Sequence, residues 1–134
     1  KKKLENIISK DVLKKIKLYK FNQNKNFLNK IYSKTDIYVN TSIYEGFPNT
    51  IVEAVIFECL VITSNSIGGC RELIKNNNYG LFYEPNDYHK LSKRIKYAIK
   101  NFNYCKSKIK IAKRDLIKKA NQNNNNYKKF FDKI

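Results

Sequence analysis

Short apolar, β-branched runs alternate along this chain with segments of helical period, and this alternation constrains the fold most. Asp36–Asn40, Leu60–Thr63 and Leu81–Tyr83 are each predicted to be strands. Pro48–Glu58 and Leu91–Phe102 place their apolar residues at helical spacing. Strands that alternate with helices in this way form parallel sheets with right-handed crossovers. The sequence therefore predicts an α/β fold, a Rossmann-like parallel sheet with flanking helices.

Further elements are expected on either side of these. The apolar period from Leu4 to Ile16 predicts a helix, and a short strand is expected from Ile16 to Phe21. Shorter helices are expected around residues 27–32 and 72–74, the second of them after the Gly68-Gly69 break.

The C-terminal third is predicted to be mostly helical. Tyr104–Ala120 has a helical pattern, 121–126 is a low-complexity break, and 127–134 is expected to form a last helical turn or to fray. We expect residues 1–103 to form a partial α/β domain and residues 104–134 a C-terminal helical tail. The chain has no methionine and opens directly on three lysines, so we expect an excised or truncated piece of a longer protein.

The net charge of +17 would ordinarily suggest nucleic acid or an anionic membrane as a partner. However, Lys, Asn, Ile, Tyr and Phe are abundant and Arg is scarce, which is the pattern of an AT-rich genome. Only Arg71, Arg94 and Arg114 are arginines, whereas specific readers of phosphates and bases favour Arg for its bidentate fork. We therefore weigh codon bias above binding to nucleic acid.

Cysteine and histidine do not form a metal or nucleophile signature. Cys59, Cys70 and Cys105 are widely spaced and lack a CxxC pair, so reduced structural thiols are expected. His89 lies at a predicted helix start, where a solvent-exposed side chain is expected. No apolar run approaches the ~20 residues needed to span a bilayer, and we expect a cytoplasmic protein.

Two carboxylates, Glu45 and Glu53, bracket a predicted strand-to-helix turn. In open α/β sheets, ligands bind at the carboxyl ends of the strands, where this turn lies. Gly46 permits close approach of the backbone to a ligand, and Pro48 suits the first turn of a helix. The free amides from Gly46 to Thr50 would then offer donors to a phosphate or to sugar hydroxyls.

Glu53 is the only charge in the run from Ile51 to Phe57, which is hydrophobic all round as in a helix packed on more than one side. Such a carboxylate is rare unless it is paired or holds a ligand, because its desolvation costs several kcal/mol. Two carboxylates at different depths can accept hydrogen bonds from the vicinal hydroxyls of ribose or hexose. The alternatives are a surface acid for Glu45 and a lysine salt bridge for Glu53.

Several blocks together resemble one known family. They are Glu45-Gly46-Phe47-Pro48-Asn49 through Glu53-Ala54, then Val61-Ile62-Thr63, Gly68-Gly69-Cys70-Arg71-Glu72-Leu73-Ile74 and Tyr79-Gly80-Leu81-Phe82. Over about Leu18 to Asn101, their order and spacing resemble the C-terminal domain of a retaining glycosyltransferase of family 4, with the GT-B fold. Residues 1–103 would then be part of a donor-binding domain.

The resemblance implies a donor site for a nucleotide-diphospho-sugar, with no metal ion and no cofactor. Glu45 would be the catalytic residue that stabilises positive charge at the anomeric carbon. The donor would be bound by the turn and the helix that follow, through Gly46, Phe47, Pro48, Asn49, Thr50 and Glu53, the last of which would hold the ribose hydroxyls. The acceptor, a glycan or a lipid-linked acceptor, would be bound by an N-terminal domain, and peripheral contact with the inner face of a membrane is a further expectation.

Departures from the family pattern also stand in the sequence. Phe57-Glu58-Cys59-Leu60 lacks the glycine helix stop and the proline that the family usually has before the next strand. The first strands of the donor domain and its phosphate-gripping Arg and Lys are absent, so an exposed sheet edge is expected and the chain alone should not be catalytically competent. Two alternatives stay open, a basic module that binds nucleic acid or an anionic surface, and an inactive relic that binds sugar nucleotides.

Overall fold

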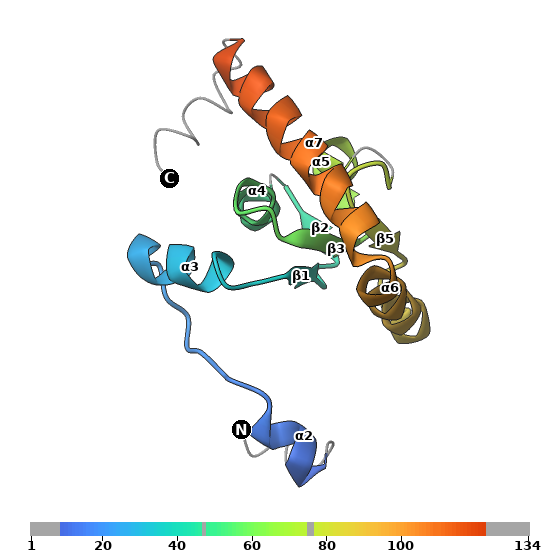
Figure 1. The fold of residues 1–134 in the computed structure, drawn as a ribbon. Coiled ribbons are helices and arrows are strands. Elements are labelled where there is room, and N and C mark those ends of the chain that lie inside the picture. Colours follow the sequence, from blue (N-terminus) through green and yellow to red (C-terminus); the bar gives the residue numbers. More distant parts are fainter. Residues whose placement is uncertain (1–8, 47, 75–76, 123–134) are drawn as a thin grey trace.

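Three parallel strands form the main sheet, in the spatial order β1, β3, β5. The computed structural model describes residues 9–46, 48–74 and 77–122, except for the side chains of residues 45, 67 and 68. The elements in chain order are α2 (Lys10–Lys14), α3 (Lys25–Tyr32), β1 (Ile37–Asn40), β2 (Tyr44–Glu45), α4 (Asn49–Ile56), β3 (Leu60–Ser64), β4 (Ile67–Gly68), α5 (Cys70–Ile74), β5 (Leu81–Tyr83), α6 (Tyr88–Lys100) and α7 (Phe102–Asn121) (Figure 1). The predicted α/β class with a parallel sheet and flanking helices is confirmed.

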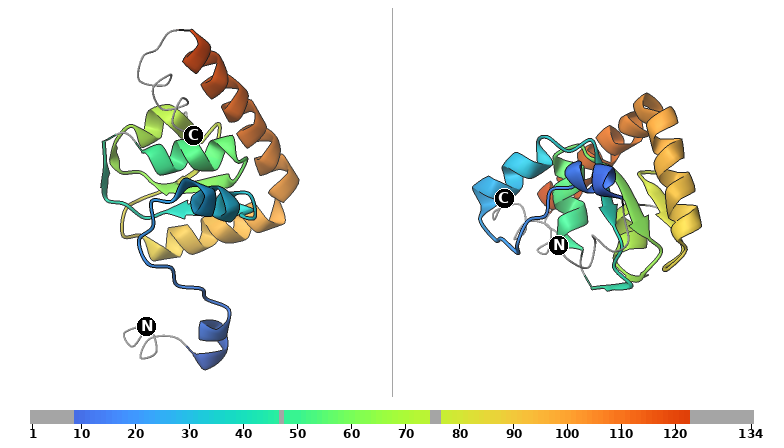
Figure 2. Two further views of the ribbon diagram at one scale, coloured as in Figure 1. Left: turned by 90° about the vertical axis from the view of Figure 1, so that its left-hand side faces the viewer. Right: turned by 90° about the horizontal axis from the view of Figure 1, so that it is seen from below.

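Helices cover both faces of this sheet (Figure 2). On one face, Ile51 of α4, Leu73 of α5 and Ile109 of α7 share a core with Val61 of β3. On the other face, Leu60 and Ile62 of β3 pack with Ala98 of α6. All five residues of β3 are buried, which explains why this strand is apolar almost throughout.

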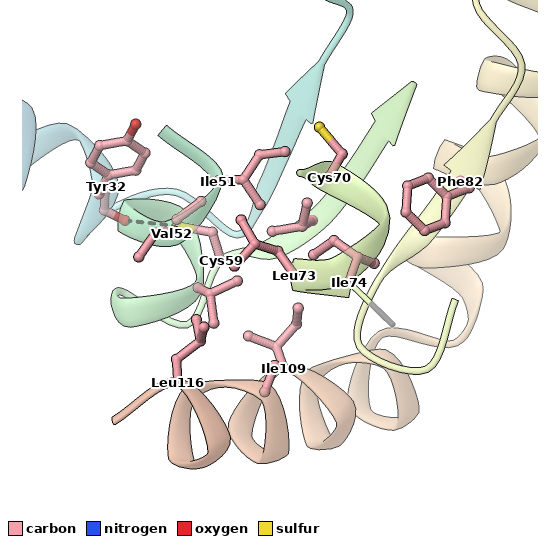
Figure 3. Packing of buried hydrophobic residues seen from close by; sticks show 14 of the residues in the cluster. Tyr32, Ile51, Val52, Cys59, Cys70, Leu73, Ile74, Phe82, Ile109 and Leu116 are labelled. Carbon is pink, nitrogen blue, oxygen red and sulfur yellow. Dashed lines mark hydrogen bonds between the residues drawn. The ribbon is translucent and has the colours of Figure 1, made fainter. Parts of the chain in front are cut away.

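The C-terminal helix α7 joins the two cores. Its Cys105 lies in the α6 cluster, whereas Ile109 and Leu116 lie in the α4 cluster. Figure 3 shows the side chains of Ile109 and Leu116 directed into the same core as Ile51 and Leu73. The helix expected at 104–120 is confirmed, and it contributes buried residues to the core of the α/β unit.

The two edges of the main sheet differ. At β5, the Phe82 N–H donates to Asn77 Oδ1 at 2.7 Å, and Arg94 Nε donates to the Phe82 carbonyl at 2.8 Å. Side chains therefore form hydrogen bonds with the backbone N–H and carbonyl of Phe82 on the outer edge of β5, where no further strand within the described residues pairs. At β1, no strand of the described chain pairs with the outer edge, so the expected exposed edge is present there.

One local prediction is wrong, and one pair of strands was not predicted. Residues 16–24 form no strand, and Leu18, Tyr19 and Phe21 are exposed. A strand needs a neighbour for its backbone hydrogen bonds, and the described chain supplies none to this segment. In addition, β2 and β4 were not expected; they pair in parallel as a second, two-stranded sheet.

The chain termini are described only in part. Of the helix expected from Leu4 to Ile16, the structure describes α2, none of whose residues is buried, and residues 1–8 lie outside the described part. The predictions for 127–134 and for most of the break at 121–126 also lie outside it. No helix of the described residues is long and apolar enough to cross a membrane.

The end of α4 shows how the chain manages without the family's glycine. Glu58 has a left-handed backbone, with φ of 60°. The Cys59 N–H donates to the Ala54 carbonyl at 2.8 Å and the Glu58 N–H to the Val55 carbonyl at 2.9 Å, which is the Schellman pattern that normally favours glycine. Lys113 Nζ contacts the Glu58 carboxylate at 3.0 Å, so an ion pair with α7 helps to offset the strain.

The expectations for cysteine and histidine hold. Cys59, Cys70 and Cys105 are free and buried, and burial raises the pKa of the Cys59 and Cys105 thiols. The His89 side chain is exposed.

Candidate functional site

The predicted site residues follow β1 and lead into α4. Glu45 is the last residue of β2, Gly46 comes next, and Asn49 and Thr50 begin α4. Phe47 and the side chain of Glu45 lie outside the described residues. The motif therefore lies at the carboxyl end of the sheet, where ligands bind in open α/β folds.

A second loop from the same edge of the sheet joins the first one. Tyr44 pairs with Ile67, Glu45 pairs with Gly68, and the Gly69 N–H donates to the Gly46 carbonyl at 3.1 Å. The double glycine of the sequence, weak evidence when taken alone, is thus held beside the Glu45 turn. Strands of two residues carry too little pattern to be predicted, so the sequence could not show this pairing.

The turn between β2 and α4 leaves room for a ligand. Apart from its two chain neighbours, no described residue has an atom within 4 Å of the position that a Cβ on Gly46 would occupy. Pro48 is the N-cap residue of α4, one position earlier than expected, and it is buried. Its carbonyl accepts from the Ile51 and Val52 amides at 3.0 and 3.2 Å. The first amides of a helix have no acceptor within it, and Asn49 and Thr50 lie exposed at this end.

Glu53 lies at the border between the buried and exposed sides of α4. Ile51, Val52, Ala54 and Val55 are buried, but Thr50 is exposed and Glu53 is half-buried. The expectation of a helix packed on more than one side is confirmed, because α4 contacts β1, β3, α5 and α7, but the Glu53 side of α4 is only partly covered. The carboxylate faces less desolvation than the sequence suggested, and water or a ligand can reach it.

Tyr32 of α3 is a neighbour of Glu53 that sequence reasoning missed. Its ring stacks on Phe57 with centroids 5.7 Å apart, and its hydroxyl donates to the Thr50 carbonyl at 3.4 Å. Burial, and then the nearby Glu53 carboxylate, raise the pKa of Tyr32 above its ordinary value. Tyr32 thus packs α3 against the helix that carries Glu53.

A group of buried polar residues lies next to the site, at the carboxyl end of the sheet. Asn40, Thr63, Ser64 and Ser66 are the buried polar residues of the described chain, and they lie at or just beyond the ends of β1 and β3. Their side chains hydrogen-bond to each other or to nearby backbone and side chains. In the described residues, no buried polar side-chain atom is left without a partner.

The assembled parts offer backbone donors and an open glycine at the carboxyl end of the sheet, and the Glu53 carboxylate on the helix that follows. This set can bind a ligand that carries both an anionic group and hydroxyl groups. Within the described residues, no group of three or more His, Cys, Asp or Glu side chains is placed to hold a metal ion.

Comparison with known proteins identifies the family of the chain. The model of the family described as "Glycosyl transferases group 1" matches residues 1–115. A Campylobacter jejuni enzyme, GalNAc-alpha-(1->4)-GalNAc-alpha-(1->3)-diNAcBac-PP-undecaprenol alpha-1,4-N-acetyl-D-galactosaminyltransferase, is 30% identical over 83 residues, which are 62% of this chain and 23% of that enzyme. An uncharacterized glycosyltransferase of Methanocaldococcus jannaschii is 27% identical over 97 residues, 72% of this chain and 25% of that protein.

Solved structures agree with this match. A glycosyltransferase from Rickettsia africae superposes with a TM-score of 0.69 at 27% identity, over 90% of this chain and 34% of that one. The C-terminal domain of a group 1 glycosyl transferase, LpcC, from Francisella tularensis superposes with a TM-score of 0.66 at 23% identity, over 75% of this chain and 51% of that one. The chain spans about a quarter of the length of the curated relatives. The chain belongs to the group 1 glycosyl transferases, family 4, and its fold matches part of the C-terminal domain of a GT-B enzyme.

Proposed function

We propose that this chain forms part of the donor-binding domain of a retaining glycosyltransferase and binds a nucleotide-diphospho-sugar. The observation that carries the proposal is the pairing of β2 with β4. It brings the Glu45-Gly46 turn, the Gly68-Gly69 loop and the start of α4 to one edge of the sheet.

Each part has a role in the proposed site. The amides near Gly46, Asn49 and Thr50, with Phe47 and Pro48 shaping the turn, would bind the sugar hydroxyls and the diphosphate. Glu53, half-buried and reachable from solvent, would accept hydrogen bonds from the ribose hydroxyls. Glu45 would stabilise positive charge at the anomeric carbon while the diphosphate itself assists its own departure.

The relatives suggest the chemistry of donor and acceptor. Two Campylobacter jejuni relatives are named as N-acetylgalactosaminyltransferases acting on undecaprenol-linked sugars. We therefore propose transfer of an N-acetylhexosamine or related sugar to a lipid-linked glycan, with an acceptor-binding domain completing the site. The proposed location is the cytoplasmic face of a membrane.

The charge distribution supports contact with an anionic surface. Residues 88–122, in α6 and α7, contain twelve Lys or Arg and a single acid, Asp115, whereas residues 37–87 contain two basic and six acidic residues. A codon bias toward lysine acts on the whole chain, so it does not explain why neighbouring segments differ in sign. Exposed Tyr97, Ile99 and Tyr104 accompany the lysines, and aromatic residues beside lysines suit a membrane interface.

Binding measurements separate donor binding from a purely basic module. We expect UDP-N-acetylgalactosamine or GDP-mannose to bind, and binding to be lost in Glu53→Ala. Glu58→Ala is the matched control, because it removes the same charge just beyond the opposite end of α4. The basic module would be favoured instead if the chain bound DNA in a salt-sensitive way, with the same affinity in wild type and in Glu53→Ala, and bound neither sugar nucleotide.

The proposed membrane contact has its own test. We expect sedimentation with vesicles that contain phosphatidylglycerol but not with pure phosphatidylcholine vesicles, and release at high salt. Equal sedimentation with both kinds of vesicle, or with neither, would contradict this contact and leave the donor site unaffected.

A further inference from the structure

The loop that leads from β1 to Glu45 is held by side chains of all three strands of the main sheet. Asn40, the last residue of β1, is only 6% exposed and is paired in register with Thr63 of β3. Burying an amide is unfavourable unless its polar atoms are hydrogen-bonded. An apolar side chain would fill this position with no such requirement, so the bonds of Asn40 need an explanation.

Asn40 forms hydrogen bonds through both its side-chain amide and its backbone carbonyl. Its Oδ1 accepts from the Ser42 N–H at 3.1 Å, and its Nδ2 donates to Thr63 Oγ1 at 3.3 Å. Its backbone carbonyl accepts from the Tyr83 hydroxyl of β5 at 3.2 Å. The three strands are thus joined by side chains at the carboxyl edge, in addition to their backbone ladder.

Ser42 is where this network meets the loop. Its N–H donates to Asn40, and its carbonyl accepts from Ser64 Oγ. Ser42 lies three residues before Glu45. The residue after Glu45 is Gly46, whose carbonyl accepts a hydrogen bond from the Gly69 N–H. The segment 42–46 is therefore fixed at both ends, by the buried network on one side and by β4 on the other.

We propose that Asn40 is a positioning residue for the donor sugar, which acts through Ser42 on the segment 42–46, with Ser64 and Tyr83 supporting it. This role rests on the donor-binding function proposed above. The segment carries Glu45, which would contact the sugar, whereas Glu53 on α4 would hold the ribose. Loosening the segment should therefore impair recognition of the sugar more than recognition of the nucleotide, whose ribose would be held by Glu53 and whose diphosphate would also be held by the amides of Asn49 and Thr50.

The ligand-free chain gives the first test, by amide hydrogen exchange. In Asn40→Leu and Tyr83→Phe, we expect exchange in residues 42–46 to accelerate about tenfold, with α4 changing less than about threefold. Tyr83→Phe keeps its ring and guards against a folding defect in Asn40→Leu. Tyr79→Phe is the matched control, because it removes a hydroxyl that donates to Asp115 of α7, away from the loop. No acceleration in 42–46, or equal acceleration in α4, would overturn the proposal.

Calorimetric titration with UDP-N-acetylgalactosamine and with UDP gives the second test. We expect Asn40→Leu and Tyr83→Phe to bind the sugar nucleotide about tenfold more weakly and to bind UDP within about twofold of wild type. A parallel loss of both ligands, or no loss of either, would refute the positioning role while binding that depends on Glu53 persists. Failure of the wild type to bind either probe would refute donor binding and the positioning role together.

Discussion

Replacing Gly80 with alanine tests how closely the residue before β5 packs against Val61 of β3 and Ile74 of α5. A Cβ at this position would lie 2.7 Å from the Val61 carbonyl oxygen and 3.0 Å from Cγ2 of Ile74. Val61 lies in the middle strand of the sheet, in register with Tyr38 of β1, so its backbone cannot shift without disturbing the sheet. Overpacking of this kind costs typically about 1–3 kcal/mol, and we expect Gly80→Ala to lose stability by that amount.

Gly46→Ala is the matched control for this substitution. Beyond its chain neighbours, no atom of the described residues lies within 4 Å of its Cβ position, and neither glycine has a left-handed backbone. At such a site, alanine stabilises by up to about 1 kcal/mol because it restricts the unfolded chain. Urea denaturation at neutral pH measures both changes, with the slope m checked for constancy. A neutral or stabilising Gly80→Ala would refute the packing argument, and a destabilising Gly46→Ala would refute the open space at the donor turn.

Three further substitutions test the core and two titrating groups. Ile109→Ala should destabilise the chain by about 2–5 kcal/mol in urea denaturation, because the Ile109 side chain is fully buried. Ile111→Ala should cost under about 1 kcal/mol, because the Ile111 side chain is 43% exposed. Equal losses would contradict the packing of α7. Burial and Glu53 raise the pKa of Tyr32, so its stabilising contribution is complete below the unfolded pKa of about 10 and is lost above it. Between pH 9 and 11, wild type should lose stability that Tyr32→Phe retains, and parallel curves would be the contrary result. A hydrogen bond from Lys113 lowers the pKa of Glu58, so Glu58→Gln should be less stable than wild type at pH 7, and the difference should shrink as the pH falls below about 4.

The main sheet could be predicted from the sequence because its strands depend on local composition. Leu60–Ser64 is buried on both faces, and the apolar run records that burial directly. The segment from Ile16 to Phe21 also contains apolar and aromatic residues but forms no strand, since a strand also needs a neighbour to pair with. Propensity identifies candidate strands, and pairing partners decide among them.

The site divides in the same way. That the motif from Glu45 to Glu53 follows a strand and leads into a helix could be predicted, because the motif is continuous in the sequence. The pairing of β2 with β4 and the bonds of Asn40 to Ser42 and Tyr83 could not be located. They join residues that are separated along the chain or that form elements of only two residues, and such contacts leave no periodic signal.

An NMR titration of the ¹⁵N-labelled chain with UDP-N-acetylgalactosamine tests the donor site most directly. We expect the amides of Gly46, Asn49, Thr50 and Gly69 to shift on binding, and these shifts to disappear in Glu53→Ala. Amides in the basic helix α6 should stay unchanged. Shifts confined to α6 and α7, or no shifts at saturating nucleotide sugar, would contradict a donor site at the carboxyl edge of the sheet.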